Sequence, residues 1–273
     1  MAQILSLGTK IPYQDKATKR LYVIRRLNNA LKFVDNKYIN LTGTPLNSYL
    51  SASNDFTITF DFLRTQEADV HHFLMHVGLD TNVGGVFRFF YIGGASNAFT
   101  YEERSQSGVY EGYQTAAVVP VGTQSRVTMS RQHNPSTTKV YQEGVPVFTF
   151  AEGSDKSGLS YNTTNNLSFG SPVDFLNFCG YVARVVVYNR VLTDAEVLQL
   201  NHRDNVPLIS AIPGLIAYYK VSEKNEKTLF DGSGQNSHGT LINYNDAETA
   251  SNGQPQSGNT AWVNAYSLLP ITE

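Results

Sequence analysis

The segment from residue 54 to residue 62, Asn-Asp-Phe-Thr-Ile-Thr-Phe-Asp-Phe, constrains the fold of this chain more than any other. Phe or Ile occupies every second position from 56 to 62, and Thr or Asp occupies the positions between them. Because successive side chains of a β-strand point to opposite faces of the sheet, this alternation predicts a strand with one buried and one solvated face. A strand of this kind requires a second layer that covers its apolar face.

Similar short apolar segments recur along the chain and are separated by turn-forming residues. We expect strands at residues 87–92, 125–130, 138–142, 145–150, 180–188, 213–221 and 240–244. The segment 180–188 is apolar at both sets of alternating positions, which predicts a central strand, whereas Pro146 predicts an edge position or the start of a strand. Hydrophobic residues make up 41% of the chain, which is enough for a full core.

One short helix is expected near residues 193–203. Thr193-Asp-Ala-Glu196 has the spacing of a capping box, in which the Thr hydroxyl and the Glu carboxylate accept hydrogen bonds from each other's backbone N–H groups. The residues expected on the apolar side of this helix are Val197, Leu198 and Leu200. The predicted fold class is therefore all-β, a two-sheet antiparallel jelly-roll sandwich with this one helix.

Basic residues concentrate near the N-terminus. Residues 1–32 contain seven Lys or Arg and one Asp, a net charge of +6, so the remainder carries −8 of the formal total of −2. This predicts a basic N-terminal arm over residues 1–27 that docks onto an acidic surface, with an ordinary solvated face as the alternative. The expected anchoring residues are Lys16, Lys19, Arg20, Arg25 and Arg26. The basic stretch is too short and the rest too acidic for a nucleic-acid-binding protein.

Three segments together resemble the concanavalin A-like lectin/glucanase superfamily, and within it the laminin-G-like jelly-roll domain. They are residues 30–41 with 54–60, residues 139–147, and residues 180–197, and the resemblance covers residues 28–204. The last of them, Gly-Tyr-Val-Ala-Arg-Val-Val-Val-Tyr-Asn-Arg-Val-Leu-Thr-Asp-Ala-Glu-Val, is the most specific.

A fourth segment, residues 214–243, is similar to the piece that usually precedes the opening strands in this family, but here it follows the helix. About sixty residues are too few for another full sandwich. We therefore expect one sandwich over residues 28–273, in which residues 208–268 wrap back to complete it. The alternative is that they begin a small second unit.

The resemblance leaves both catalysis and binding open, because the superfamily includes glycosidases and polysaccharide lyases as well as lectins. The sandwich glucanases carry Glu-x-Asp-x-(x-)Glu on one strand face, and that spacing is absent from this sequence. Arg64-Thr-Gln-Glu67 and Tyr218-Tyr-Lys220 are weakly similar to pairs of the alginate-lyase-like sandwiches, but the Gln-x-His triplet is missing. We expect a non-catalytic module, with a polysaccharide-degrading enzyme of the same fold as the alternative.

Exposed aromatic side chains would stack on sugar faces or on partner side chains. The predicted ligand-binding residues, in segments that we expect to be long polar loops, are Tyr101, Tyr110, Tyr113 and Tyr161. The related lectins often hold calcium through loop carboxylates and backbone carbonyls, so Asp231, in its Gly- and Ser-rich loop, is the candidate ligand for Ca²⁺. The alternative for Asp231 is a simple Asx-turn.

The expected partner is a glycan or a virion or host surface protein, without nucleic acid and without membrane insertion. The chain starts at Met1 with no recognisable export signal, has one cysteine, and carries a basic arm ahead of its sandwich. These features predict a bacteriophage spike, decoration protein or adhesin on the virion surface, present as a homo-oligomer. The alternative is a secreted bacterial carbohydrate-binding protein.

Overall fold

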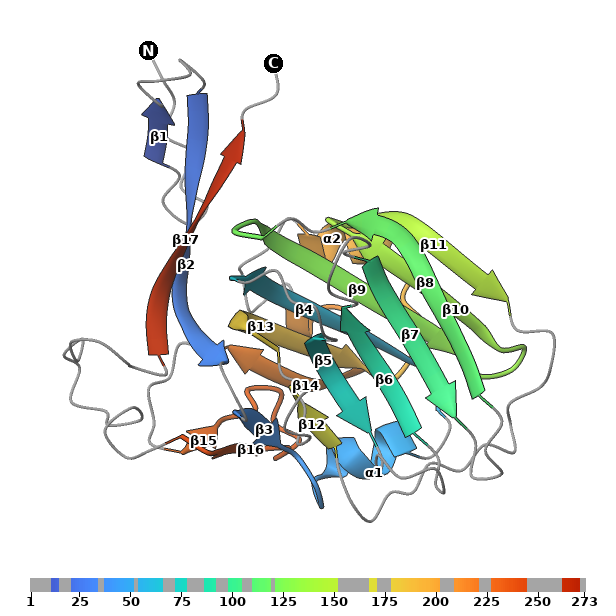
Figure 1. The fold of residues 1–273 in the computed structure, drawn as a ribbon. Coiled ribbons are helices and arrows are strands. Elements are labelled where there is room, and N and C mark those ends of the chain that lie inside the picture. The colour runs from blue at the N-terminus through green and yellow to red at the C-terminus, as the bar shows by residue number, and fades with distance from the viewer. Residues whose placement is uncertain are drawn as a thin grey trace.

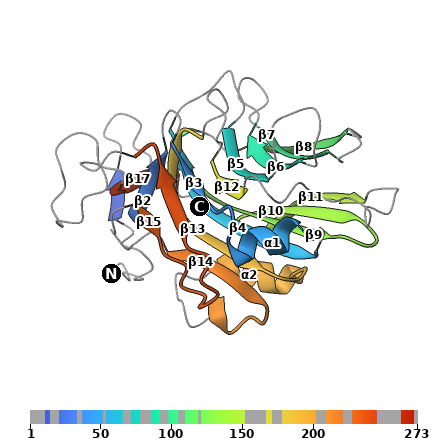
Figure 2. The same cartoon turned by 90° about the horizontal axis from the view of Figure 1, so that it is seen from below.

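The computed structural model describes residues 11–14, 21–33, 37–51, 54–65, 72–77, 86–91, 98–104, 110–118, 121–151, 167–170, 178–201, 209–220, 227–244 and 262–270. Within these residues the chain forms two antiparallel sheets packed as a sandwich, which confirms the predicted fold class. Two helices accompany the sheets in this part of the chain, α1 (Pro45–Ser51) and α2 (Asp194–Asn201), of which only α2 was expected. Figure 2 shows the sheets as separate layers, with α2 on the outward side of one of them.

One sheet, called sheet A, contains the long strands predicted from sequence. In order across the sheet its strands are β1 (Ile11–Gln14), β2 (Leu21–Phe33), β13 (Gly180–Tyr188), β4 (Phe56–Arg64), β9 (Gln124–Gln132), β10 (Thr137–Gln142) and β11 (Val145–Ala151). Two further strands, β14 (Leu215–Lys220) and β17 (Trp262–Pro270), pair with β13 and β2. β13 is central and β11 ends the order, as their sequences predict.

The other sheet, called sheet B, faces sheet A across the core (Figure 1). In order its strands are β15 (Thr228–Leu229), β16 (Gly239–Ile242), β3 (Tyr38–Asn40), β12 (Leu167–Phe169), β5 (His72–Val77), β6 (Val86–Tyr91), β7 (Ala98–Arg104) and β8 (Tyr110–Val118). Strands β7 and β8 lie where the sequence was expected to form loops.

Segments late in the chain add strands to both sheets. β14 pairs with β13 over Arg184–Tyr188. The same edge of β13 pairs with β2 over Gly180–Val182. In sheet B, β16 pairs with β3 and β15 pairs with β16. The backbone N–H of Leu46 donates to Ser237 Oγ at 3.0 Å, a bond between residues 191 positions apart.

The division into an arm over residues 1–27 and a body over residues 28–273 stays a prediction. Its boundary falls inside β2, so residue 27 does not mark the end of a structural element. Limited proteolysis tests the division, because a separate arm would be released while the sandwich stays intact.

The core lies between the sheets and is rich in aromatic rings. Phe60 of β4 packs edge-on against Phe169 of β12 at a centroid distance of 5.5 Å, and Phe62 packs against Phe99 of β7 at 6.2 Å. All four rings are at most 1% exposed. Burying such a ring contributes about 1.5–3 kcal/mol, and an edge-to-face pair adds about 0.5–1.5 kcal/mol. These cross-sheet pairs therefore hold the two layers together.

Strand β4 is buried on both faces, so the prediction of a solvated face is wrong. Thr57 pairs with Ser130 through their hydroxyl oxygens at 2.7 Å, and Thr59 pairs with Thr128 at 2.8 Å. These polar residues remain on the outward face of sheet A but lie beneath a cover. The cover comes from parts of the chain that follow β13.

Candidate functional site

The outward face of sheet A is closed by the chain itself. A second apolar cluster, separate from the core between the sheets, lies on this face, and each member is at most 5% exposed. Its members are Tyr141, Val186, Tyr188, Leu192, Val197, Leu200, Ile209, Ile212 and Tyr218. Helix α2 contributes Val197 and Leu200, whereas Leu198 is 44% exposed, so its predicted place on the apolar side is wrong.

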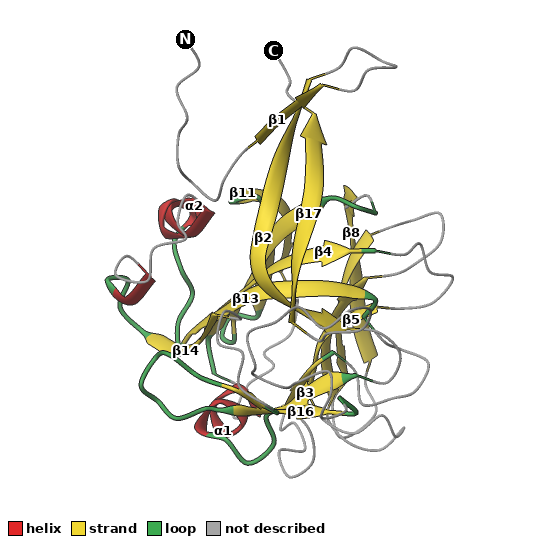
Figure 3. Cartoon of the chain, turned by 90° about the vertical axis from the view of Figure 1, so that its left-hand side faces the viewer, coloured by secondary structure: helices red, strands yellow, loops and turns green. Residues whose placement is uncertain are grey.

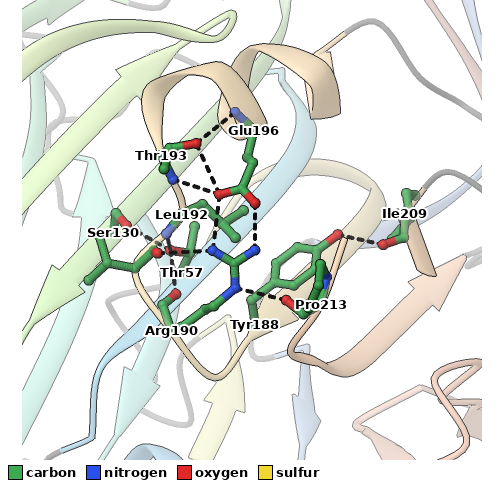
Figure 4. A network of polar contacts seen from close by, with 10 residues as sticks. Thr57, Ser130, Tyr188, Arg190, Leu192, Thr193, Glu196, Ile209 and Pro213 are labelled. Atoms are coloured by element: carbon green, nitrogen blue, oxygen red, sulfur yellow. Dashed lines mark hydrogen bonds and ion pairs between the residues drawn. The ribbon is translucent and has the colours of Figure 1, made fainter. Parts of the chain in front are cut away.

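The N-terminal end of α2 is fixed by the predicted capping box (Figure 4). The backbone N–H of Thr193 donates to Glu196 Oε2 at 2.9 Å, and the N–H of Glu196 donates to Thr193 Oγ1 at 3.3 Å. Arg190 donates to both carboxylate oxygens of Glu196, at 3.0 and 2.6 Å, and to the carbonyl of Pro213 at 2.9 Å. The pKa of Glu196 is lowered to about 2, mainly because the Arg190 guanidinium is hydrogen-bonded to its carboxylate.

The first turn of α2 is also bonded to strand β10. The Tyr141 hydroxyl donates to Asp194 Oδ1 at 2.8 Å, and Lys139 Nζ lies 3.3 Å from the same oxygen. Burial, together with the Asp194 carboxylate, raises the pKa of Tyr141, so the phenol stays protonated and remains a donor. A carboxylate in this turn also suits the positive end of the helix dipole.

The C-terminal end of α2 rests on a buried ion network. Arg126 Nη1 donates to the carbonyls of Leu200 at 2.7 Å and Asn201 at 2.5 Å. Arg126 also binds the Asp61 carboxylate, and Arg184 Nε lies 2.8 Å from Asp61 Oδ2. The three charged residues are at most 5% exposed. Because α2 is bonded at both ends, the outward face of sheet A is occupied by the chain's own helix.

The outward face of sheet B instead carries a row of polar residues that crosses most of the sheet. From β16 to β7, the directly opposed residues are Thr240, Asn40, Ser168, His76, Arg88 and Glu102. The adjacent row belongs to the core and consists of Leu241, Ile39, Phe169, Met75, Phe89 and Tyr101. Because neighbouring strand positions alternate between faces, the polar row faces away from the core.

The centre of this polar row is nevertheless buried. His76 and Ser168 are 1% exposed and Glu102 is 6% exposed. Thr100, which shares the Glu102 face of β7, is 5% exposed, and its hydroxyl has no hydrogen-bond partner among the described residues. An unsatisfied buried hydroxyl costs about 1–3 kcal/mol. Such a group is usually satisfied by ordered water or by a ligand, which makes this face the candidate binding face.

The comparison with protein families identifies the chain. The model of the concanavalin A-like lectin/glucanases superfamily matches residues 35–198, a range that ends within α2. The chain belongs to this superfamily. A search of curated proteins gave no significant match.

Solved structures of low sequence identity share this concanavalin A-like fold. The CBM40 module of a Ruminococcus gnavus IT-sialidase, bound to α2,3-sialyllactose, has a TM-score of 0.55 at 17% identity, over 64% of this chain and 97% of that one. A Bacteroides ovatus protein whose name proposes carbohydrate binding has a TM-score of 0.58 at 17% identity, over 79% of this chain and 58% of that one. Leech intramolecular trans-sialidase has a TM-score of 0.51 at 18% identity, over 65% of this chain and 28% of that one.

The predicted tyrosine site is not assembled as expected. Tyr101 is 2% exposed in the core, where its hydroxyl accepts a hydrogen bond from Arg131 Nε at 3.0 Å, so its prediction as an exposed ligand contact is wrong. Tyr110 and Tyr113 lie in strand β8, opposite Arg104 and Tyr101, rather than in a loop. Tyr161 lies outside the described residues. Ligand binding by Tyr110, Tyr113 and Tyr161 stays a prediction.

Of the predicted anchoring residues, only two lie in the described part of the chain. Arg25 and Arg26 are consecutive in β2, opposite Ser267 and Tyr266 of β17, so they occupy opposite faces of that strand pair. Lys16, Lys19 and Arg20 lie outside the described residues. Anchoring stays a prediction for all five.

Asp231 organises its own loop. Its carboxylate accepts hydrogen bonds from the N–H groups of Tyr218, Ser233 and Ser237 at 2.9–3.0 Å and from Ser233 Oγ at 2.8 Å. The bond from the Ser233 N–H, two residues on, has the spacing of the Asx-turn that was the alternative for Asp231, and a cation would compete with these four donors. Within the described residues, no group of three or more His, Cys, Asp or Glu side chains could hold a metal ion. Calcium binding stays an untested prediction.

Of the residues that are weakly similar to a lyase site, Arg64 and Tyr218 are buried, whereas Lys220 is exposed and Glu67 lies outside the described residues. Arg64 is 0% exposed and Tyr218 is 4% exposed, and Tyr218 belongs to the covered cluster on sheet A. None of the helices in the described part is long and apolar enough to cross a membrane.

The sequence did carry a signal for the polar row, although it was not used. Phe99 and Tyr101 alternate with Thr100 and Glu102, which is the same period of two that identifies β4. That alternation predicts a strand with a polar outward face at 98–104. It does not predict which residues of other strands complete the row.

Proposed function

We propose that this concanavalin A-like chain is a non-catalytic recognition module that binds carbohydrate on the outward face of sheet B. The observation that carries the proposal is the buried polar row, together with the unpaired hydroxyl of Thr100 beside it. The two outward faces are the broad surfaces of a sandwich, and that of sheet A is covered by α2 and the second apolar cluster. The outward face of sheet B carries polar residues where sheet A carries an apolar cluster, and for this reason we place the ligand on sheet B.

The residue types of the row suit a sugar. Carbohydrates present many hydroxyl groups, each of which both donates and accepts, and the row combines acceptors such as Glu102 with donors such as Arg88 and the two-sided groups of Asn40 and Ser168. We assign the buried members, His76 and Ser168, to positioning their neighbours, and direct contact to members nearer the edge of the row. The similar modules that bind sialyllactose support a carbohydrate ligand by their shared fold.

The finer assignments stay proposals. A spike, decoration or adhesin on a virion surface and a secreted bacterial carbohydrate-binding protein are the two placements that we consider, with a host-surface glycan or a partner protein as ligand. Mass spectrometry of purified particles distinguishes the placements, because a virion component is recovered at a fixed copy number.

A glycan array followed by calorimetry tests the binding function. We expect the wild-type protein to bind at least one glycan class, and Arg88→Ala and Glu102→Gln to weaken that binding at least tenfold, or about 1.4 kcal/mol. The matched control is Thr149→Ala, an exposed position on β11 of sheet A, which should bind as the wild type does. Binding that is unchanged in both sheet B variants would refute the proposed face.

Depolymerisation assays on the glycans that bind separate recognition from turnover. A non-catalytic module releases no reducing ends or unsaturated products during long incubation. Product formation that is abolished by Glu102→Gln would establish the enzyme alternative instead.

A further inference from the structure

The end of sheet B formed by β15, β16 and β3 exposes its outward face. Figures 1 and 3 show β16 beside β3 at this end of the sheet. Thr240 of β16 is exposed, and its neighbours on either side, Thr228 and Asn40, are half-buried. Farther along the same polar row, Ser168 and His76 are only 1% exposed. Within the described residues, the polar row is therefore open to a ligand at this end.

An apolar surface lies directly beside the open end of the polar row. Tyr38 of β3 lies opposite Ile242 of β16. Tyr38 is two positions from Asn40, and residues two positions apart in a strand share a face of the sheet. The residue between them, Ile39, is 1% exposed in the core, whereas Tyr38 and Ile242 are half-buried. Tyr38 and Ile242 therefore form an apolar platform on the outward face, which we call the tyrosine platform.

A pair of rings flanks the polar row on its other side. Phe230, which follows β15, packs edge-on against His238, which precedes β16, at a centroid distance of 5.2 Å. The residues on either side of Phe230 point inward, because Leu229 belongs to the core and Asp231 bonds to sheet A, so Phe230 points outward. The N–H of Asp231 donates to His238 Nδ1 at 3.0 Å, which makes Nε2 the donor of the neutral ring.

The polar groups beside the tyrosine platform carry no formal charge. Asn40 Oδ1 accepts a hydrogen bond from the N–H of Thr42 at 3.0 Å, which orients the amide and leaves its Nδ2 group as the donor for a ligand. Thr240 adds a hydroxyl that both donates and accepts. Lys37 alternates with the platform tyrosine, and its Nζ lies over the ring of the core residue Tyr244 at 5.3 Å. A charged ligand group would lose water here without gaining an opposite charge, so this surface suits an uncharged ligand.

The charged members of the polar row lie too far away to contact the same sugar unit. Arg88 of β6 is three strands from Asn40, and Glu102 of β7 is four strands away. At about 4.8 Å per strand these separations are about 14 and 19 Å. A glycan that contacts either residue as well as the tyrosine platform therefore contains more than one sugar unit.

We propose that Tyr38 is the stacking residue of a subsite that takes one uncharged hexopyranose unit of the bound glycan, an inference that rests on the proposed carbohydrate-binding function. The C–H face of such a ring packs on Tyr38 and Ile242, and its hydroxyl groups bond to Asn40 and Thr240. Ligand sites typically combine apolar and aromatic walls with a few polar groups that fix the orientation of the ligand. A tyrosine suits this role because its flat ring offers a large apolar surface.

The choice of glycan tests the charge of the ligand. Calorimetry compares neutral cello-, manno- and galacto-oligosaccharides with the acidic glycans tetragalacturonate and 3′-sialyllactose. We expect at least one of the neutral series to bind. Binding of acidic glycans alone overturns the subsite but leaves the proposed carbohydrate-binding function in place, whereas binding of no glycan overturns both.

Substitutions of Tyr38 test the stacking contact. Tyr38→Ala should weaken binding of the neutral oligosaccharide on the order of tenfold, whereas Tyr38→Phe keeps the ring and should stay within about threefold of wild type. Tyr181→Ala is the matched control, because Tyr181 is a half-buried strand tyrosine of sheet A, and it should bind as the wild type does. Unchanged binding by Tyr38→Ala, when Arg88→Ala weakens it, overturns the subsite and retains the proposed function. If Tyr38→Ala fails to fold by circular dichroism, Tyr38→Leu, which stays apolar but lacks the ring, should show the same loss, and its unchanged binding overturns the subsite equally.

Discussion

The outward faces of sheets A and B both bury polar and charged side chains, but the partners of these side chains differ between the two faces. On sheet A, Asp61 contacts Arg126 and Arg184, and Arg126 in turn holds the end of α2. On sheet B, the Thr100 hydroxyl has no hydrogen-bond partner in the described part of the chain. A polar group that is bonded inside the fold stabilises it, whereas one without a partner lowers stability and is retained where another function needs it. The ion network therefore stabilises the fold on the outward face of sheet A, and we propose recognition for the outward face of sheet B.

The largest expected effect tests the ion network of sheet A. Asp61→Ala removes the carboxylate that both guanidinium groups contact in a buried site, so it should lower the free energy of unfolding by about 3–5 kcal/mol. Urea denaturation at pH 7 measures this loss. Asp194→Ala is the control, because that carboxylate is 57% exposed and should contribute at most about 1 kcal/mol. Equal losses of unfolding free energy from the two changes would show that the buried network stabilises the fold no more than an exposed carboxylate does.

The next effect tests how α2 covers sheet A. Leu200→Ala should destabilise the protein by about 2–5 kcal/mol, because Leu200 is fully buried beneath the helix. Leu198→Ala removes the same atoms from a residue that is 44% exposed, and its effect should stay within about 0.5 kcal/mol. Thermal or urea unfolding of both variants measures the difference. A similar loss from each would mean that the helix is not packed as described.

A smaller effect, dependent on pH, tests the N-terminal end of α2. The folded pKa of Glu196 is about 2, below its unfolded value of about 4.3, so the ionised carboxylate stabilises the fold above pH 5. This contribution is lost as the pH falls from about 5 to about 2. Glu196→Gln should cost on the order of 1 kcal/mol at pH 7, since water screens the partly exposed pair, and almost nothing near pH 2. A pH-independent difference would exclude the ion pair with Arg190 as its cause.

The smallest expected effect is a change in the free energy of unfolding whose sign differs between the outward faces of sheets A and B. Thr100→Val removes an unpaired buried hydroxyl, so it should raise the free energy of unfolding by up to about 1 kcal/mol while weakening glycan binding. Thr59→Val is the matched change on sheet A, where the hydroxyl pairs with Thr128 at 2.8 Å, and it should cost about 1 kcal/mol. Denaturation together with calorimetry measures both quantities. Destabilisation by Thr100→Val would place that hydroxyl among the structural groups.

Most of the fold could be predicted from sequence because its signals are local. The alternation in β4, the doubly apolar β13 and the capping box at Thr193 each lie within nine residues or fewer. The cover over Thr57 and Thr59 could not be predicted in this way. Thr57 bonds to Arg190 and Leu192, more than 130 positions along the chain, and no pattern within the β4 segment indicates what packs on its outward face.

The candidate binding face was missed for a related reason. Its polar row contains one residue from each of the six strands between β16 and β7. Only cross-strand register brings His76 between Ser168 and Arg88. Register depends on turns and on packing, which a local pattern does not contain. Tyr101 was placed in a loop because its polar neighbours obscured the alternation that directs it into the core.

The late position of β14 and β16 in the chain affects how the protein is made. Sheet B is not complete until residue 242 has left the ribosome, because β16 pairs with β3. Sheet A is not complete until residue 270 has, because β14 pairs with β13 and β17 pairs with β2. Pairings across such distances, as between Leu46 and Ser237, slow folding to the millisecond-to-second range or beyond. Until then the free edges of β13 and β3 can pair with other nascent chains. The yield of soluble protein should therefore depend strongly on the speed of translation and on the availability of chaperones during synthesis.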